Sequence, residues 1–126
     1  MKKVVLLGST GSIGTSTVKV AEDLPDQIRL IGLAAGGNAA LLLEQTRKHR
    51  PGAISIADPA KAQELRDTVG VTTEVYCGNE GLLKLATLPE ADIVLIAIVG
   101  TAGLQPALAA IRAGKDIAIA SKEILV

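Results

Sequence analysis

Short apolar runs alternate with longer stretches of helical periodicity along the whole chain. The apolar runs predict six strands, at residues 4–7, 28–35, 53–56, 73–76, 92–98 and 116–120. Apolar residues at helical spacing predict five helices between these strands, at residues 12–23, 39–48, 59–68, 79–88 and 104–113. Asn38 and Asp58 are suitable N-caps for two of the helices, and Pro59 suits the first helical position after Asp58.

This alternation sets the fold class. Repeated strand–helix units with nearly continuous apolar strands indicate an α/β fold, a Rossmann-like, doubly wound, mostly parallel sheet with helices on both faces. The length of 126 residues suits a single domain covering residues 1–126. The predicted strand at residues 92–98 is the most apolar, so we expect it to lie centrally, buried on both faces.

A glycine-spaced turn joins the first predicted strand to the first predicted helix. Gly8, Gly11 and Gly14 follow directly on the apolar run 4–7. Glycines allow the backbone to approach a pyrophosphate closely, and the free N–H groups of a helix start attract its charge. Any tight strand-to-helix turn also favours glycine, but the position directly after the first strand favours a phosphate-binding turn.

Four segments of small, glycine-rich or polar residues fall at the carboxyl ends of predicted strands. Ligands of an open parallel sheet bind beyond these ends. Four such segments together favour a dinucleotide-binding surface over glycine turns that serve the fold alone. The segments are Gly8–Gly14, Gly36–Asn38, Gly100–Gly103 and Ser121–Glu123.

The end of the second predicted strand bears on the choice between NAD and NADP. NAD-binding folds place Asp or Glu there to accept hydrogen bonds from the ribose hydroxyls. The segment Ala34–Asn38 contains no carboxylate that would repel a 2′-phosphate, and no Arg or Lys that would bind one. Asn38, backbone N–H groups and the helix start would have to bind the phosphate. The segment therefore favours NADP.

Composition excludes several classes of partner. The 13 basic and 13 acidic residues cancel, and Tyr76 is the only aromatic residue, so we expect no nucleic-acid partner. No apolar run approaches the length of a membrane span, so we expect no membrane partner. The single cysteine, Cys77, excludes an intrachain disulfide and suits a reducing compartment, which predicts a cytoplasmic protein.

Several chemistry-bearing residues have two interpretations. Lys122 and Glu123 would face a nicotinamide, where Lys122 could neutralise a substrate anion, or they are a solvated pair that opens a helix. His49 lies in a basic helix C-terminus, and Cys77 has no identifiable base nearby, so neither is favoured as catalytic. Asp58 is favoured as a helix cap, and no spacing of His, Cys and carboxylates indicates a metal site.

Taken together, the segments at residues 6–14, 33–38, 97–106 and 120–126 resemble the 1-deoxy-D-xylulose 5-phosphate reductoisomerase family, in family order and over the whole chain. The resemblance implies that the pyrophosphate of NADPH and its neighbouring groups are held by Thr10, Gly11, Ser12 and Ile13. It implies that Gly36, Gly37 and Asn38 surround the adenosine ribose and its 2′-phosphate.

The resemblance also assigns the end of the chain. Lys122 matches a substrate-contacting lysine, and Glu123 and Ser121 match cofactor-contacting positions. Two residues depart from the family pattern: many members carry Lys or Arg where Gly37 stands, and members usually have Asn where Ser121 stands. The departure at Gly37 predicts weaker affinity for the phosphate.

For the whole enzyme, the resemblance implies a homodimer that isomerises a sugar phosphate and reduces it with NADPH to 2-C-methyl-D-erythritol 4-phosphate, with Mg²⁺ or Mn²⁺ as the metal. The apolar ending Ile124–Val126 has no cap, so we expect the chain to be a fragment that lacks the metal-binding part and is inactive alone. The alternatives are another NAD(P)-dependent reductase module and a non-catalytic domain that senses NADP(H).

Overall fold

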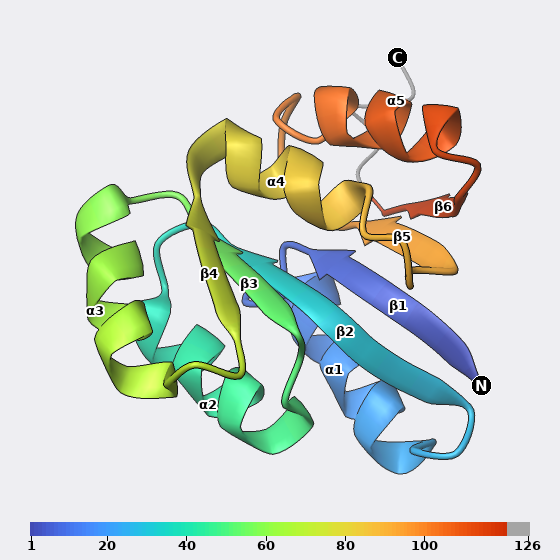
Figure 1. Cartoon of the computed structure of the whole chain (residues 1–126). Coiled ribbons are helices and arrows are strands. Elements are labelled where there is room, and N and C mark those ends of the chain that lie inside the picture. The colour runs from blue at the N-terminus through green and yellow to red at the C-terminus, as the bar shows by residue number, and fades with distance from the viewer. Residues whose placement is uncertain (121–126) are drawn as a thin grey trace.

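The computed structural model describes residues 1–120, in which strands and helices alternate strictly (Figure 1). The strands are β1 (Lys2–Leu7), β2 (Ile28–Ala35), β3 (Ala53–Ile56), β4 (Glu74–Cys77), β5 (Ile93–Ile96) and β6 (Asp116–Ile119). The helices are α1 (Ser12–Asp23), α2 (Ala39–His49), α3 (Pro59–Val69), α4 (Gly78–Ala86) and α5 (Leu104–Arg112). The predicted alternation is therefore confirmed, and the bounds differ from the predicted ones by a few residues at most.

All six strands join one sheet, in the order β4-β3-β2-β1-β5-β6. Every neighbouring pair is parallel. The chain builds outward from β1 to β4 and then returns to the other side of β1 with β5. The switch point of this doubly wound sheet, where ligands of such folds bind, therefore lies between β1 and β5.

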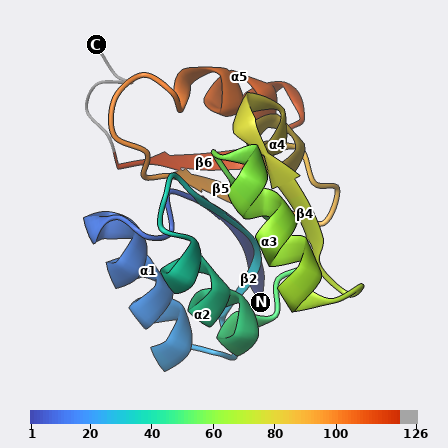
Figure 2. The same ribbon diagram turned by 90° about the vertical axis from the view of Figure 1, so that its left-hand side faces the viewer.

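Helices cover both faces of the sheet, as predicted. Figures 1 and 2 show α4 and α5 on the opposite side from α1 and α2. One core cluster joins β-strand residues such as Leu6 and Leu33 to Val18, Leu42 and Leu65 of α1, α2 and α3. A second cluster joins strand residues such as Leu7 and Val94 to residues of α4 and α5. Alternate residues of β1 and of β5 supply the two clusters, as period-two strand geometry requires, whereas the register shift between β1 and β2 interrupts the alternation in β2.

The expectation that the strand within residues 92–98 lies at the centre of the sheet, buried on both faces, is wrong. β5 lies between β1 and β6, one place from the edge, and β1 and β2 form the central pair. Val94 and Ile96 are buried in the cluster beneath α4 and α5, whereas Ile93 and Leu95 are only partly buried at the margin of the other cluster. The apolar character of β5 therefore reflects burial that is complete on one face only.

Local capping explains where two of the helices begin. The side chain of Asn38 accepts a hydrogen bond of 3.1 Å from the backbone N–H of Leu41 at the start of α2. The side chain of Asp58 accepts one of 2.8 Å from the N–H of Ala60 at the start of α3. Both predicted caps are confirmed. Among the residues that the structure describes, no helix has the length and apolar character needed to cross a membrane.

Candidate dinucleotide-binding site

A cavity of about 420 Å³ opens at the carboxyl edge of the sheet. We call it the carboxyl-edge cleft. It brings together three of the four segments selected from the sequence, and none of its lining residues is charged. The lining residues are Gly8, Thr10, Gly11, Ala34–Asn38, Ser55, Ile56, Ala57, Gly78, Asn79, Leu82, Ala97, Ile98, Val99 and Ala102. Its volume lies within the usual range of small-molecule sites, about 300–1,000 Å³.

The three glycines of the turn after β1 differ in what surrounds them. Gly8 has a φ of +100°, and a Cβ atom on it would lie 2.6 Å from the carbonyl oxygen of Ala97. A Cβ atom on Gly14 would collide with the carbonyl group of Gly8. A Cβ atom on Gly11 would meet nothing nearer than the Gly8 oxygen at 3.8 Å. The fold itself therefore requires glycine at positions 8 and 14 but not at position 11.

The start of α1 leaves donors available to an anion. Gly11 is the N-cap, makes no side-chain cap, and is followed by a first turn without acidic residues. The first helical hydrogen bond runs from the N–H of Thr15 to the carbonyl oxygen of Gly11, at 2.8 Å. The preceding N–H groups, of residues 12–14, have no partner within the helix. Thr10 and Gly11 line the cleft, whereas Ser12 and Ile13 lie just outside its lining.

Hydrogen bonds to β2 and α2 hold the glycine turn in place. The backbone N–H groups of Gly8 and Ser9 both donate to the carbonyl oxygen of Ala34, each at 2.8 Å. The buried side chain of Gln45 in α2 donates through Nε2 to the carbonyl oxygen of Ser9 at 2.9 Å. Gln45 was not predicted as part of the site, because nothing local to α2 indicates that its amide reaches the turn after β1.

The loop after β2 contacts the loop after β3. The N–H of Ala57 donates to the carbonyl oxygen of Gly36 at 3.1 Å. The Nζ of Lys61, in α3, donates to the carbonyl oxygen of Gly37 at 2.8 Å. Residues 34–38 contain no Lys or Arg, but Lys61 reaches this loop from α3, because β3 lies beside β2 in the sheet. Adjacent parallel strands place their following loops side by side, which is the sequence-level indication that was missed.

Of the two remaining predicted segments, one lines the cleft in part and the other is not described by the structure. In the loop after β5, Ala97–Val99 and Ala102 line the cleft, whereas Gly100, Thr101 and Gly103 do not. Ser121, Lys122 and Glu123 lie outside the described residues. One side of the cleft, built by the end of β3, the loop after it and α4, was not predicted, because its residues form no recognisable motif in the sequence. Those residues are Ser55, Ile56, Ala57, Gly78, Asn79 and Leu82.

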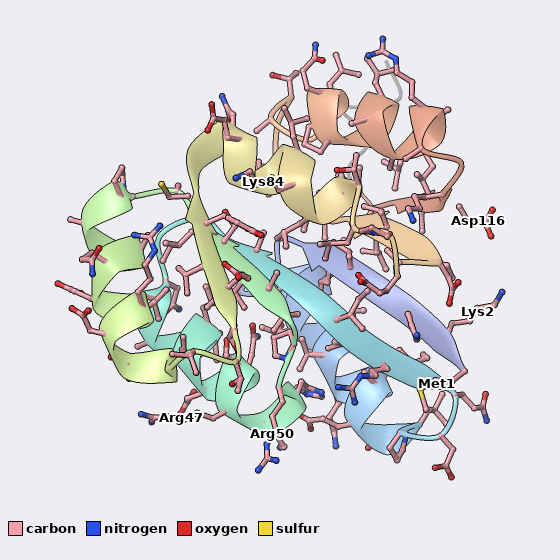
Figure 3. All side chains as sticks on the ribbon, viewed as in Figure 1. Met1, Lys2, Arg47, Arg50, Lys84 and Asp116 are labelled. Carbon is pink, nitrogen blue, oxygen red and sulfur yellow. The ribbon has the colours of Figure 1, made fainter. Side chains whose placement is uncertain are left out.

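Within the described residues, the other candidate residues do not gather at a second centre. His49, at the end of α2, has its Nε2 atom 3.6 Å from Glu22, away from the cleft. Figure 3 shows Lys2, Arg47, Arg50 and Asp116 around the outside of the fold; they belong to the amino ends of strands and to the end of α2. Within residues 1–120, no three His, Cys, Asp or Glu side chains are grouped to hold a metal ion.

The family model described as 1-deoxy-D-xylulose 5-phosphate reductoisomerase matches residues 4–126 of this chain. The chain belongs to this reductoisomerase family. A protein of that name from Synechococcus sp. is 50% identical over 129 residues, and one from Pelotomaculum thermopropionicum is 44% identical over 128. Each alignment covers 100% of this chain but only 32% and 33% of the respective relative. The chain thus spans about a third of the length of these reductoisomerases.

Solved reductoisomerase structures share the fold described above. A reductoisomerase in complex with NADPH, fosmidomycin and magnesium is 36% identical, with a TM-score of 0.94. The match covers 99% of this chain and 31% of that one. The enzyme from Zymomonas mobilis in complex with NADPH is 38% identical, with a TM-score of 0.90. That match covers 98% of this chain and 33% of the Zymomonas chain. The six-stranded Rossmann-like sheet is therefore that of the family.

Proposed function

We propose that this chain is the NADPH-binding part of a reductoisomerase that converts 1-deoxy-D-xylulose 5-phosphate to 2-C-methyl-D-erythritol 4-phosphate. The observation that carries the proposal is the open space beside Gly11, at the rim of an uncharged cleft. Gly8 and Gly14 are explained by the backbone that they approach, whereas no close backbone contact requires glycine at position 11, where a bound pyrophosphate would. The two related structures in complex with NADPH support the choice of that ligand.

In this proposal, each rim of the cleft holds one part of NADPH. Thr10, Gly11 and the N–H groups of Ser12 and Ile13 bind the pyrophosphate, because the uncapped start of α1 favours negative charge. Gly36, Gly37 and Asn38 surround the adenosine ribose. The nicotinamide lies towards the loop after β5, on the other side of the switch point.

When bound, NADPH supplies a hydride for reduction of a carbonyl carbon. This chain's part is to bind the cofactor and to orient it. The Asn38 side-chain oxygen already accepts from Leu41 N–H, so its amide N–H₂ group remains the donor available to the ribose or its phosphate. Ser121 and Glu123 are proposed as further cofactor contacts and Lys122 as a contact of the sugar phosphate substrate.

The metal belongs elsewhere in this proposal. Related reductoisomerase structures contain magnesium, but residues 1–120 offer no group of ligands for it. We therefore assign the Mg²⁺ or Mn²⁺ site to the two thirds of the enzyme that the alignments do not cover. The homodimer, the cytoplasmic location and the absence of a nucleic-acid partner stay predictions.

A parallel titration tests the proposal. The chain is titrated with NADPH and with NADH at one ionic strength, while the fluorescence of the reduced nicotinamide is followed. Saturable binding that favours NADPH is expected. A chain that shows native α/β circular dichroism and binds neither dinucleotide would contradict the proposal, and equal binding of both would contradict the choice of NADPH.

A further inference from the structure

Lys61 lies beside the loop to which the proposed function assigns the adenosine ribose. Its Nζ is 2.8 Å from the carbonyl oxygen of Gly37, to which it donates a hydrogen bond. A Cβ atom built on Gly37 would lie 3.9 Å from that same Nζ. The ammonium group of Lys61 is therefore next to the point at which a side chain at position 37 would begin.

The charge of Lys61 is available to a ligand. An ammonium group has three N–H donors, and the Gly37 carbonyl uses one of them. Within residues 1–120, the lysine–carboxylate pairs are Lys19 with Asp23 and Lys48 with Glu22, so Lys61 has no carboxylate partner there. Its side chain is half-buried, which reduces the screening of its charge by water.

The position of Lys61 is unfavourable for its own helix. It is the third residue of α3, whose first turn contains no acidic residue. The positive end of the helix dipole disfavours a cation in the first turn, and Glu or Gln is the common choice at this position. Helix stability therefore does not explain a lysine here, whereas an anion bound beside the loop would.

We infer that Lys61 determines the specificity for NADPH by binding the 2′-phosphate, and so supplies from α3 the cation that Gly37 lacks. The inference rests on the proposed function and extends it to one residue. A hydrogen bond from an ammonium group to a phosphate oxygen is charge-assisted and stronger than a neutral one. NADH has only a hydroxyl group at the same carbon, so the lysine contributes little to its binding.

The test compares two lysines that the fold places in similar surroundings. Lys61→Gln keeps most of the side-chain length and removes the charge. Lys115→Gln is the matched control, because Lys115 is also half-buried and its Nζ also donates to a backbone carbonyl, that of Pro89, at 3.2 Å. Lys115 immediately precedes β6 and therefore lies at the amino ends of the strands, opposite the cleft.

Dissociation constants for NADPH and NADH are measured for the parent chain and both variants. Lys61→Gln is expected to raise the constant for NADPH by about tenfold to a hundredfold and that for NADH less than about twofold. Lys115→Gln changes neither, and Lys61→Arg retains the preference for NADPH. Adenosine 2′,5′-bisphosphate and adenosine 5′-monophosphate, used as competitors, should show the same contrast without the nicotinamide.

The outcomes separate this inference from the proposed function. If Lys61→Gln binds NADPH as the parent does, the lysine does not bind the phosphate, and the proposed function stands. If both dinucleotides weaken equally, Lys61 only positions the Gly37 loop, and the specificity inference is overturned. If the folded parent chain binds neither dinucleotide, the proposed function fails and the inference fails with it.

Discussion

The backbone of Gly14, in the first turn of α1, lies so close to the carbonyl group of Gly8 that a Cβ atom on Gly14 would collide with it. This contact holds the start of the helix against the end of β1. Gly11 stands between these two glycines in the sequence but has open space at the equivalent point. A single glycine-spaced motif therefore combines two residues needed for packing with one left open to the cleft.

Gly14→Ala is expected to lower the free energy of unfolding by about 1–3 kcal/mol, because the methyl group overpacks a site bounded by backbone. Intrinsic propensity predicts the opposite sign, since Ala is favoured over Gly in a helix by about 1 kcal/mol. Urea unfolding decides between the two. Gly11→Ala is the control: it replaces the N-cap glycine without a collision, so it should lower the urea midpoint less than Gly14→Ala does. An unchanged midpoint for Gly14→Ala would refute the packing argument.

Gly11→Val is expected to abolish measurable NADPH binding while the fold persists. The backbone at Gly11 is extended, with a φ of −80° and a ψ of 179°, which valine adopts readily. Its two methyl groups would occupy space that the proposed function gives to the pyrophosphate. Cofactor fluorescence measures the binding and circular dichroism checks the fold. Retained NADPH affinity would mean that the phosphate lies elsewhere.

Gln45→Met is expected to destabilise the chain by about 1–3 kcal/mol, because the buried carbonyl of Ser9 loses its side-chain donor. The same change should weaken NADPH binding, since the turn that carries Gly11 is then held less firmly. Gln63→Met is the matched control. Gln63 is exposed in α3 and bonds only to its neighbours Asp67 and Arg66, so its replacement should leave unfolding in urea within about 0.5 kcal/mol of the parent.

Gly37→Arg tests the Lys61 inference from the other loop. In the Lys61→Gln background, the arginine is expected to restore the preference for NADPH by about 1.5–3 kcal/mol, because one cation replaces another. In the parent background the gain is smaller, since the arginine stem starts 3.9 Å from the Lys61 ammonium group. The four dissociation-constant ratios form a double-mutant cycle. Equal gains in both backgrounds would show that the two positions act independently.

An ion pair far from the cleft gives a pH prediction. A hydrogen bond from Lys48, 3.2 Å away, lowers the pKa of Glu22 below its ordinary value, with a smaller contribution from His49. A folded-state pKa below the unfolded value adds stability above the unfolded pKa, and this stability is lost as pH falls through the folded pKa. Lys48→Met should therefore raise the pKa of Glu22. An NMR titration of the Glu22 carboxyl carbon measures this change. A carboxyl that titrates unchanged in the variant would contradict the assignment to Lys48.

The sequence predicted those features that depend on neighbours along the chain. Asn38 and Asp58 cap their helices as expected, since capping depends on a residue and the N–H groups two or three positions later. The sequence also predicted that Thr10 and Gly11 lie near Gly36–Asn38, because parallel strands bring their carboxyl ends to one edge of the sheet.

Features that depend on which strands are neighbours were missed. Lys61 was passed over because its contact with Gly37 spans 24 positions and exists only because β3 lies beside β2. The place of β5 was wrong because apolar content reports how much of a strand is buried, not where it stands in the sheet. Gln45 was missed for the same reason as Lys61, since its partner Ser9 is 36 positions away.

The hydrogen bond from Lys61 to Gly37 links two loops that each follow a different strand. Where one side chain reaches across two loops, a cation at either position can serve the same ligand. Related chains would then differ at both positions together, and each position considered alone would look variable. Sorting such enzymes by cofactor preference would require the residues at positions 37 and 61 to be considered as a pair.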